Sequence, residues 1–262
     1  MPVAQSMRTV HRCAEGRIMG SLMSRRVVIT GGGQGLGLEI ARGCVRRGAS
    51  AILIDIDESA LRDARRELGE QHCATFVCDI ADRGQVAATM SAIAAADSGG
   101  ISALVNNAGV FTNDAIEAAD PGRASLAIAV NINGTINITD AALAHNILCR
   151  ETGQIIFINS SAGDPLHTGT GASERVYAAT KGALTGYSKA IEGVAKGTPL
   201  RVTTIFPGGM DTNLYVNAGM SVADGHNKPW LIPPSRVAEA VTFVLELPVD
   251  TNISRLAIGP NL

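Results

Sequence analysis

Residues 27–37, Val27-Val28-Ile29-Thr30-Gly31-Gly32-Gly33-Gln34-Gly35-Leu36-Gly37, decide the fold of this chain of 262 residues. The β-branched residues predict a buried strand, and the glycines predict a turn into a helix over about 35–47. Glycines allow a close approach to the backbone, and the start of a helix offers unpaired N–H groups to a phosphate. The strict G-x-G-x-x-G and Walker A patterns both fail. Gly31-x-x-x-Gly35-x-Gly37 still predicts a phosphate loop, with a plain glycine turn as the less favoured alternative.

Short apolar runs and helical stretches alternate along the rest of the chain. This alternation predicts an α/β fold: a doubly wound, Rossmann-like parallel sheet of about seven strands with helices on both faces. Ligands of such sheets bind at the carboxyl ends of the strands. The stretch 211–230 is too irregular to predict an element, and we expect a lid there. Further strands are expected at 51–54, 75–78, 104–105, 155–158, 201–205 and 254–258, and helices at 58–69, 82–96, from after 105 to about 149, 175–196 and 235–246.

Composition excludes several classes of function. The chain is 46% hydrophobic but only 3% aromatic, and its net charge is −2, so no basic field favours nucleic acid or an anionic membrane. No apolar run has the length of a membrane span. The five cysteines lack a Cys-x-x-Cys pair, so we expect no disulfide framework, no metal site and a cytoplasmic location.

The first 23 residues differ from the rest. They contain several basic residues and lack the apolar centre of a secretory signal. A flexible tail or an upstream start is favoured over a targeting segment. Residues 24–262 are expected to form one catalytic domain.

Asp55 ends the second predicted strand and follows Gly37 by 18 residues. An acid near this spacing accepts the ribose hydroxyls of NAD, and its charge repels the 2′-phosphate of NADP. Neither Gln34 nor Ile56 supplies a positive charge. The sequence therefore predicts NAD, with NADP disfavoured.

Tyr177 and Lys181 lie four residues apart in a predicted helix and so share a face. A positive charge beside a phenol favours phenolate, which would make Tyr177 a general acid or base for a hydroxyl–carbonyl interconversion. Alone, the spacing is also typical of an exposed amphipathic helix.

In this order the motifs resemble the single-domain short-chain dehydrogenase/reductase family, over about residues 25–260. The resemblance rests on Thr30-Gly31-x-x-x-Gly35-x-Gly37, Asp79, Asn106-Asn107-Ala108-Gly109, Asn131, Ser160, Tyr177-x-x-x-Lys181 and Pro207-Gly208.

The resemblance implies four catalytic residues. Tyr177 would exchange a proton with the substrate, and Lys181 would lower its pKa and bind the nicotinamide ribose. Ser160 would donate a hydrogen bond to the substrate oxygen, with Ser161 as the alternative. Asn131 would hold the lysine, and Asn133 is less favoured by register.

The resemblance also implies the residues that hold the cofactor. Asp79 and Ile80 would meet the adenine, and Thr212 the nicotinamide carboxamide. The full set is Gly31, Gln34, Gly35, Leu36, Gly37, Asp55, Asp79, Ile80, Asn107, Ala108, Gly109, Tyr177, Lys181, Pro207, Gly208 and Thr212.

The expected function is NAD-dependent interconversion of a secondary alcohol and a ketone on a small molecule. The alternatives are an NADPH-dependent carbonyl reductase of the same fold, a non-catalytic dinucleotide-binding sensor, and a longer sugar-nucleotide type whose larger substrate domain is missing. A homodimer or homotetramer is expected. The connection from Ser160 to Tyr177 is longer than usual in the family, and it either shapes specificity or is a benign loop. His167 within it is expected to be a loop residue rather than a catalyst.

Overall fold

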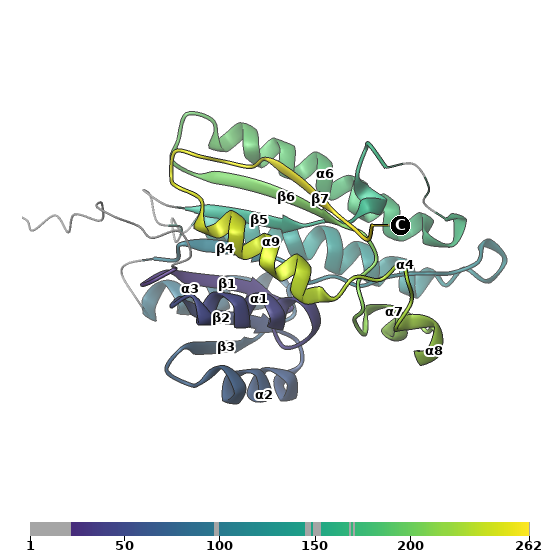
Figure 1. Ribbon diagram of the computed structural model, residues 1–262, viewed down its shortest axis with the longest axis horizontal. Coiled ribbons are helices and arrows are strands. Elements are labelled where there is room, and N and C mark those ends of the chain that lie inside the picture. The colour runs from purple at the N-terminus through teal and green to yellow at the C-terminus, as the bar shows by residue number, and fades with distance from the viewer. Residues whose placement is uncertain are drawn as a thin grey trace, which may run out of the picture.

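The computed structural model describes residues 22–96, 100–144, 148, 153–167, 169 and 171–261. Within them, seven strands form one sheet in the order β3-β2-β1-β4-β5-β6-β7, and every neighbouring pair is parallel (Figure 1). The prediction of a doubly wound parallel sheet is confirmed. The strands are β1 (Arg26–Thr30), β2 (Ser50–Asp55), β3 (Cys73–Val77), β4 (Ala103–Asn106), β5 (Gln154–Ile158), β6 (Arg201–Pro207) and β7 (Arg255–Ile258).

Alternating side chains of the strands fill two cores, one on each face of the sheet. Val27 and Ile29 of β1 point into one core, while Val28 between them points into the other. One face is covered by α1 (Gly35–Arg46), α2 (Glu58–Leu68) and α9 (Pro234–Glu246), and the other by α3 (Arg83–Ala96), α5 (Thr135–Ala144) and α6 (Arg175–Ala195). Figure 1 shows α1 and α9 side by side in front of the sheet.

Two stretches differ from their predictions. The long helix expected after β4 is interrupted: a loop follows the strand, then η1 (Ile116–Ala118), α4 (Pro121–Ala127), a π-helical turn η2 (Ile128–Gly134) and α5. Its expected end near residue 149 lies outside the described residues. The stretch expected to lack any element contains two one-turn helices, α7 (Leu214–Asn217) and α8 (Val222–Gly225), beyond one end of the sheet (Figure 1). The short 3-10 helices η3 (Ser161–Gly163) and η4 (Ala172–Glu174) precede α6.

The folded part includes residues before the expected boundary at residue 24. Leu22 is fully buried in the core, and its backbone N–H donates to the carbonyl of Arg47 at 2.8 Å. A domain cut after residue 23 would remove this contact. No helix in the described residues is long and apolar enough to cross a membrane.

Candidate active site

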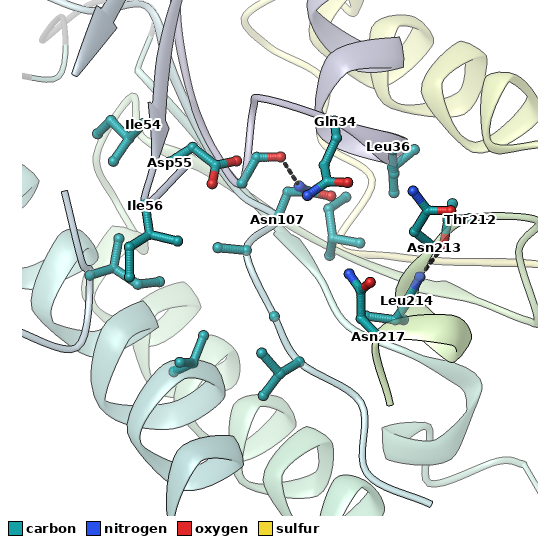
Figure 2. Close-up of a pocket in the computed structure, with 18 of the residues that line it drawn as sticks. Gln34, Leu36, Ile54, Asp55, Ile56, Asn107, Thr212, Asn213, Leu214 and Asn217 are labelled. Carbon is teal, nitrogen blue, oxygen red and sulfur yellow. Dashed lines mark hydrogen bonds between the residues drawn. The ribbon is translucent and has the colours of Figure 1, made fainter. Parts of the chain in front are cut away.

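A cavity of about 450 Å³ lies at the carboxyl ends of the strands. It is lined by the segments that follow β1 and β4, between which the strand order reverses, and this is where open α/β sheets bind ligands. Figure 2 shows Asp55 and Ile56 on one side of the cavity and Thr212, Leu214 and Asn217 on the opposite side.

The glycine loop after β1 forms the floor of this cavity. Gly31 and Gly35 have φ angles of +64° and +55°, which favour glycine. A Cβ atom on Gly37 would lie 2.0 Å from the carbonyl oxygen of Gly31, so only glycine lets the helix start pass so close beneath the turn. Gly37 thus supports the loop from below, while Gly31, Gln34, Gly35 and Leu36 line the cavity.

Asn107 holds the glycine loop in place. Its side-chain amide donates to the carbonyl oxygens of Thr30 at 2.9 Å and Gly31 at 3.2 Å. In return, the Thr30 hydroxyl accepts the backbone N–H groups of Asn107 and Ala108, both at 3.0 Å. The segment expected to line the cofactor therefore also fixes the shape of the phosphate loop.

Asp55 points from the end of β2 toward the glycine loop. One carboxylate oxygen accepts the N–H of Gly33 at 2.9 Å and the other accepts that of Asp57 at 3.1 Å. Asp57 itself caps α2 by accepting the N–H of Ala60 at 3.0 Å. Asp55 is therefore fixed in orientation while it still lines the cavity.

The wall after β3 is formed by Asp79 and Ile80. Asp79 accepts the N–H of Ala81 at 2.9 Å, and Ile80 is buried. A Cβ on Gly134 would lie 2.6 Å from the Ile80 side chain, so the π-helical turn lies directly against this wall. Both residues line the cavity as expected.

Tyr177 and Lys181 meet at the other end of the cavity. Both are buried, with 8% and 4% of their surface exposed, and the lysine Nζ atom donates to the carbonyl oxygen of Ile158 at 3.1 Å. Burial raises the pKa of Tyr177 above its ordinary value, while a hydrogen bond with Ser160 lowers it. Burial also lowers the pKa of Lys181 to about 8. The expected lowering of the tyrosine pKa is therefore wrong for the protein alone, because desolvation outweighs the favourable contacts.

Ser160 lies at the start of η3, where its Oγ atom also accepts the N–H of Ala162 at 3.2 Å. It does not line the cavity, but its contact with Tyr177 brings it to the reacting end. Ser161, the alternative, lies within η3.

Asn131 is fully buried in the π-helical turn and links three segments. Its amide donates to the carbonyl of Val110 at 2.9 Å and to the Thr180 hydroxyl at 3.0 Å, and its oxygen accepts the N–H of Val110 at 2.8 Å. A Cβ on Gly109 would lie 3.2 Å from Asn131 Oδ1 and 3.8 Å from Lys181 Nζ, so the two side chains approach one glycine. Asn133 is exposed.

Only part of the segment after β6 lines the cavity; the rest supports the end of the strand. Thr212 lines the cavity, and a Cβ on Gly35 would lie 3.8 Å from it. Pro207 and Gly208 do not line the cavity as expected; Gly208 instead donates its N–H to the carbonyl of Ile258 at 2.8 Å. They support the end of β6 because the sheet continues into β7 beside them.

A row of aromatic rings extends outward from Tyr177. Phe111 contacts Tyr177 edge to face with ring centroids 4.8 Å apart, and contacts Tyr215 in the same manner at 5.0 Å. Tyr215 continues the row to Trp230 at 5.4 Å. This aromatic wall (Phe111, Tyr177, Tyr215 and Trp230) makes the surroundings of the Tyr177 ring largely apolar.

Two polar contacts hold the segment of α7 and α8, which the sequence predicts to be a lid; α7 lines the cavity with Leu214 and Asn217. Arg123 of α4 forms an ion pair with Asp114 at 2.8 Å and also donates to the carbonyl of Ala218. His226 pairs with Asp211, and this hydrogen bond is the main cause that lowers the pKa of Asp211.

Several lining residues were not predicted. Most belong to α7 or stand directly before or after a predicted residue, and only their position near a strand end could have indicated the latter. They are Ile54, Ile56, Cys78, Val110, Leu126, Val130, Ile158, Asn159, Met210, Asn213, Leu214 and Asn217.

These residues fit a dinucleotide. The glycine cradle has room for a pyrophosphate at a helix start, and Asp55 and Lys181 stand at opposite regions of the same cavity. The fold and cavity together define a dinucleotide-binding oxidoreductase.

Comparison with known proteins gives the family. The model of the family described as short chain dehydrogenase matches residues 25–221, and the chain belongs to this family. Oxidoreductase UcpA of Escherichia coli (strain K12) is 35% identical over 192 residues, covering 72% of this chain and 71% of that protein. An uncharacterized oxidoreductase of Staphylococcus aureus (strain N315) is 28% identical, covering 92% of this chain and 100% of that protein.

Solved structures agree with the family. The closed form of a serine dehydrogenase complexed with NADP+ has a TM-score of 0.80 and 28% identity, covering 90% of this chain and 94% of that chain. A variant of actinorhodin polyketide ketoreductase with NADPH has a TM-score of 0.77 and 25% identity, covering 90% of this chain and 95% of that chain.

Proposed function

We propose that this chain is an NAD-dependent dehydrogenase that interconverts a secondary alcohol and the corresponding ketone on a small molecule. The observation that carries the proposal is the meeting of Tyr177, Lys181 and Ser160 at one end of the cavity that begins at the glycine loop. A bound nicotinamide would supply the acceptor for the hydride of the alcohol carbon. The hydroxyl proton goes to Tyr177, so alcohol and NAD give ketone, NADH and a proton.

Each side chain has one task in this proposal. Tyr177 accepts or donates the proton at its phenol oxygen, and Ser160 donates a hydrogen bond to the substrate oxygen. Lys181 favours phenolate by its charge, and Asn131 fixes the loop and helix on which the lysine depends. Because the pKa of Tyr177 is raised, the phenol holds its proton at neutral pH, which suits donation to a ketone. Oxidation is then favoured at alkaline pH.

Charge supports NAD over NADP. Asp55 and Asp79 line the cavity, and Lys181 at its far end is the only Lys or Arg among the described lining residues. A 2′-phosphate near Asp55 would meet a like charge with no arginine to offset it. Because the two solved relatives above were determined with NADP+ and NADPH, the proposal of NAD rests on Asp55.

A screen of secondary alcohols and ketones with each cofactor tests the proposal, read by the absorbance of reduced nicotinamide. We expect turnover with a higher kcat/KM for NAD than for NADP. A preference for NADP would support the carbonyl reductase alternative. Binding of NAD without turnover of any compound would support the non-catalytic sensor. The cytoplasmic location and the homo-oligomer stay predictions.

A further inference from the structure

Glu174 carries a carboxylate one helical turn before Tyr177; it does not line the cavity and has no task in the reaction above. Glu174 ends η4 and stands three residues before Tyr177, at the start of α6. Residues three apart share a helix face. Glu174 occupies the N-cap position of α6, but its side chain makes no capping hydrogen bond. The carboxylate is half-buried rather than turned fully to water.

The charge of Glu174 acts on the aromatic wall. It contributes to the raised pKa of Tyr177 and to that of Tyr215, which burial raises to about 12. Burial raises the pKa of Glu174 itself, and His167 opposes this effect. The charge of Glu174 therefore acts on both phenols from the start of α6, and exposed His167 acts on Glu174 from the preceding loop.

The nearby arginines are engaged elsewhere. Arg123 forms its ion pair with Asp114, and Arg175 donates to the backbone carbonyl of Asp114 at 2.6 Å. Within the described part of the chain, no hydrogen bond or ion pair joins either arginine to Glu174. The carboxylate thus keeps its capacity to accept hydrogen bonds at the edge of an apolar wall.

We propose that Glu174 is a specificity-determining residue that selects substrates with a protonated amine near the reacting oxygen, namely amino alcohols and amino ketones. The inference rests on the proposed function, because it concerns the substrate of the same site. A partly desolvated carboxylate gains most from a cation that also donates hydrogen bonds. The aromatic rings beside it add attraction for a cation, whereas a substrate carboxylate would meet a like charge.

The same pairing would assist the chemistry. Burial is the main cause of the raised pKa of Tyr177, and the charge of Glu174 adds a smaller part; an ammonium beside Glu174 would cancel that smaller part. The ammonium keeps its protons throughout. Only the carbinol hydrogen leaves as hydride to the nicotinamide, and only the hydroxyl proton passes to Tyr177.

Three alcohols of similar size test the proposal: isopropanolamine as the cation, sec-butanol as the neutral compound and lactate as the anion. With NAD, we expect kcat/KM for isopropanolamine to exceed that for sec-butanol by about 10-fold or more, since a charge-assisted hydrogen bond has that effect. Lactate should be the poorest of the three. Glu174→Gln should bring the ratio of kcat/KM for isopropanolamine to that for sec-butanol close to unity.

Glu192→Gln is the matched control, because it removes the same charge from the same helix. Glu192 lies roughly 22 Å from Tyr177 along the axis of α6, at about 1.5 Å per residue. This variant should keep the wild-type ratio. If Glu174 only complements the helix dipole, Glu174→Gln would lower the Tm and leave the ratio unchanged, and that result would overturn the proposal.

The remaining outcomes distinguish a failure of the proposed role of Glu174 from a failure of the proposed dehydrogenase activity. Turnover of sec-butanol without a preference for isopropanolamine would leave the dehydrogenase standing and overturn the role of Glu174. If none of the three is turned over, that result counts against the dehydrogenase. Calorimetry with isopropanolamine and NAD-saturated protein then decides on Glu174: weaker binding by Glu174→Gln supports it, and equal affinities overturn it.

Discussion

The Nζ atom of Lys181 lies over the ring of Tyr177, 5.6 Å from the ring centroid. Burial acts on the two groups in opposite directions: it raises the pKa of the tyrosine and lowers that of the lysine. Burial therefore shifts both residues toward their uncharged forms in the protein alone, although a lysine pKa of about 8 leaves Lys181 mostly charged at neutral pH. A bound cofactor or substrate that changes the local charge will shift both together, which couples proton transfer to occupancy of the site.

Tyr177→Phe removes the phenol oxygen and keeps the ring that packs on Phe111. We expect kcat/KM to fall by about 10²–10⁴-fold, the usual contribution of a general acid or base. NAD affinity should stay within a few-fold of wild type. Steady-state kinetics and a cofactor titration measure the two effects, and near wild-type turnover would contradict the assignment.

Lys181→Met should stabilise the protein and inactivate it. The lysine pKa falls from 10.5 to about 8 on folding. The cost of burying its charge is therefore absent above pH 10.5 and is complete once the pH has fallen below about 8. At pH 7 we therefore expect the variant to gain about 1–3 kcal/mol in the free energy of unfolding. The gain should shrink between pH 8 and pH 10.5. Urea unfolding at both ends of this range measures it, and a less stable variant at neutral pH would disprove the expectation.

Gly37→Ala places a Cβ atom 2.0 Å from the carbonyl oxygen of Gly31. Because the helix start and the turn must then separate, we expect NAD affinity to fall by about 10-fold or more and stability by about 1–3 kcal/mol. Gly186→Ala is the control, since Gly186 is an exposed residue of α6 and a Cβ there would meet nothing within 4 Å. That variant should gain roughly 0.5–1 kcal/mol. Equal behaviour of the two variants would refute the close-approach argument.

Asp55→Ala should relax the selectivity for NAD. It removes the acceptor proposed for the ribose hydroxyls and the charge that repels a 2′-phosphate, so we expect the ratio of kcat/KM for NAD to that for NADP to fall by about 10-fold. Asp57→Ala controls for the loss of a carboxylate nearby. It removes the cap of α2, which should cost about 0.5–2 kcal/mol of stability without changing the ratio. An unchanged ratio in Asp55→Ala would show that other residues choose the cofactor.

Asn131→Ala and its neighbour Asn133→Ala form a matched pair. The first leaves the N–H and C=O of Val110 without their buried partner, so we expect a loss of about 1–3 kcal/mol and a lower kcat. The second changes an exposed side chain and should alter stability by less than about 0.5 kcal/mol. Thermal unfolding and kinetics of both variants test whether Asn131→Ala loses more stability and activity than Asn133→Ala. The reverse result would exchange the roles of the two asparagines.

The sheet and the ends of its strands could be predicted from local patterns. Val27, Val28 and Ile29 form a short apolar run before glycines, and Asp55 follows such a run directly. Parallel strands place their carboxyl ends along one edge, so residues just past each run gather in one cavity whatever the details of packing. Asp79 and Asn107, which the family resemblance implied, line the cavity for the same reason.

Other features depend on contacts that no local pattern contains. The π-helical turn at Asn131 arises where a helix must meet both Val110 and Thr180. The lid reaches the cavity through Arg123 and the carbonyl of Ala218, which are 95 residues apart. The pKa of Tyr177 depends on how much water its surroundings exclude, and the spacing to Lys181 says nothing about that.

The aromatic wall ends in Trp230, the only tryptophan of the chain. Its indole is 39% exposed and lies close over Gly209, where a Cβ atom would come within 2.6 Å of it. Excitation of tryptophan in this protein therefore reports from one place, the junction of Tyr215 on the lid with the segment after β6. The chain carries its own fluorescent label at the substrate end of the site. Energy transfer from this indole to a reduced nicotinamide would allow cofactor arrival and lid movement to be followed without chemical labelling.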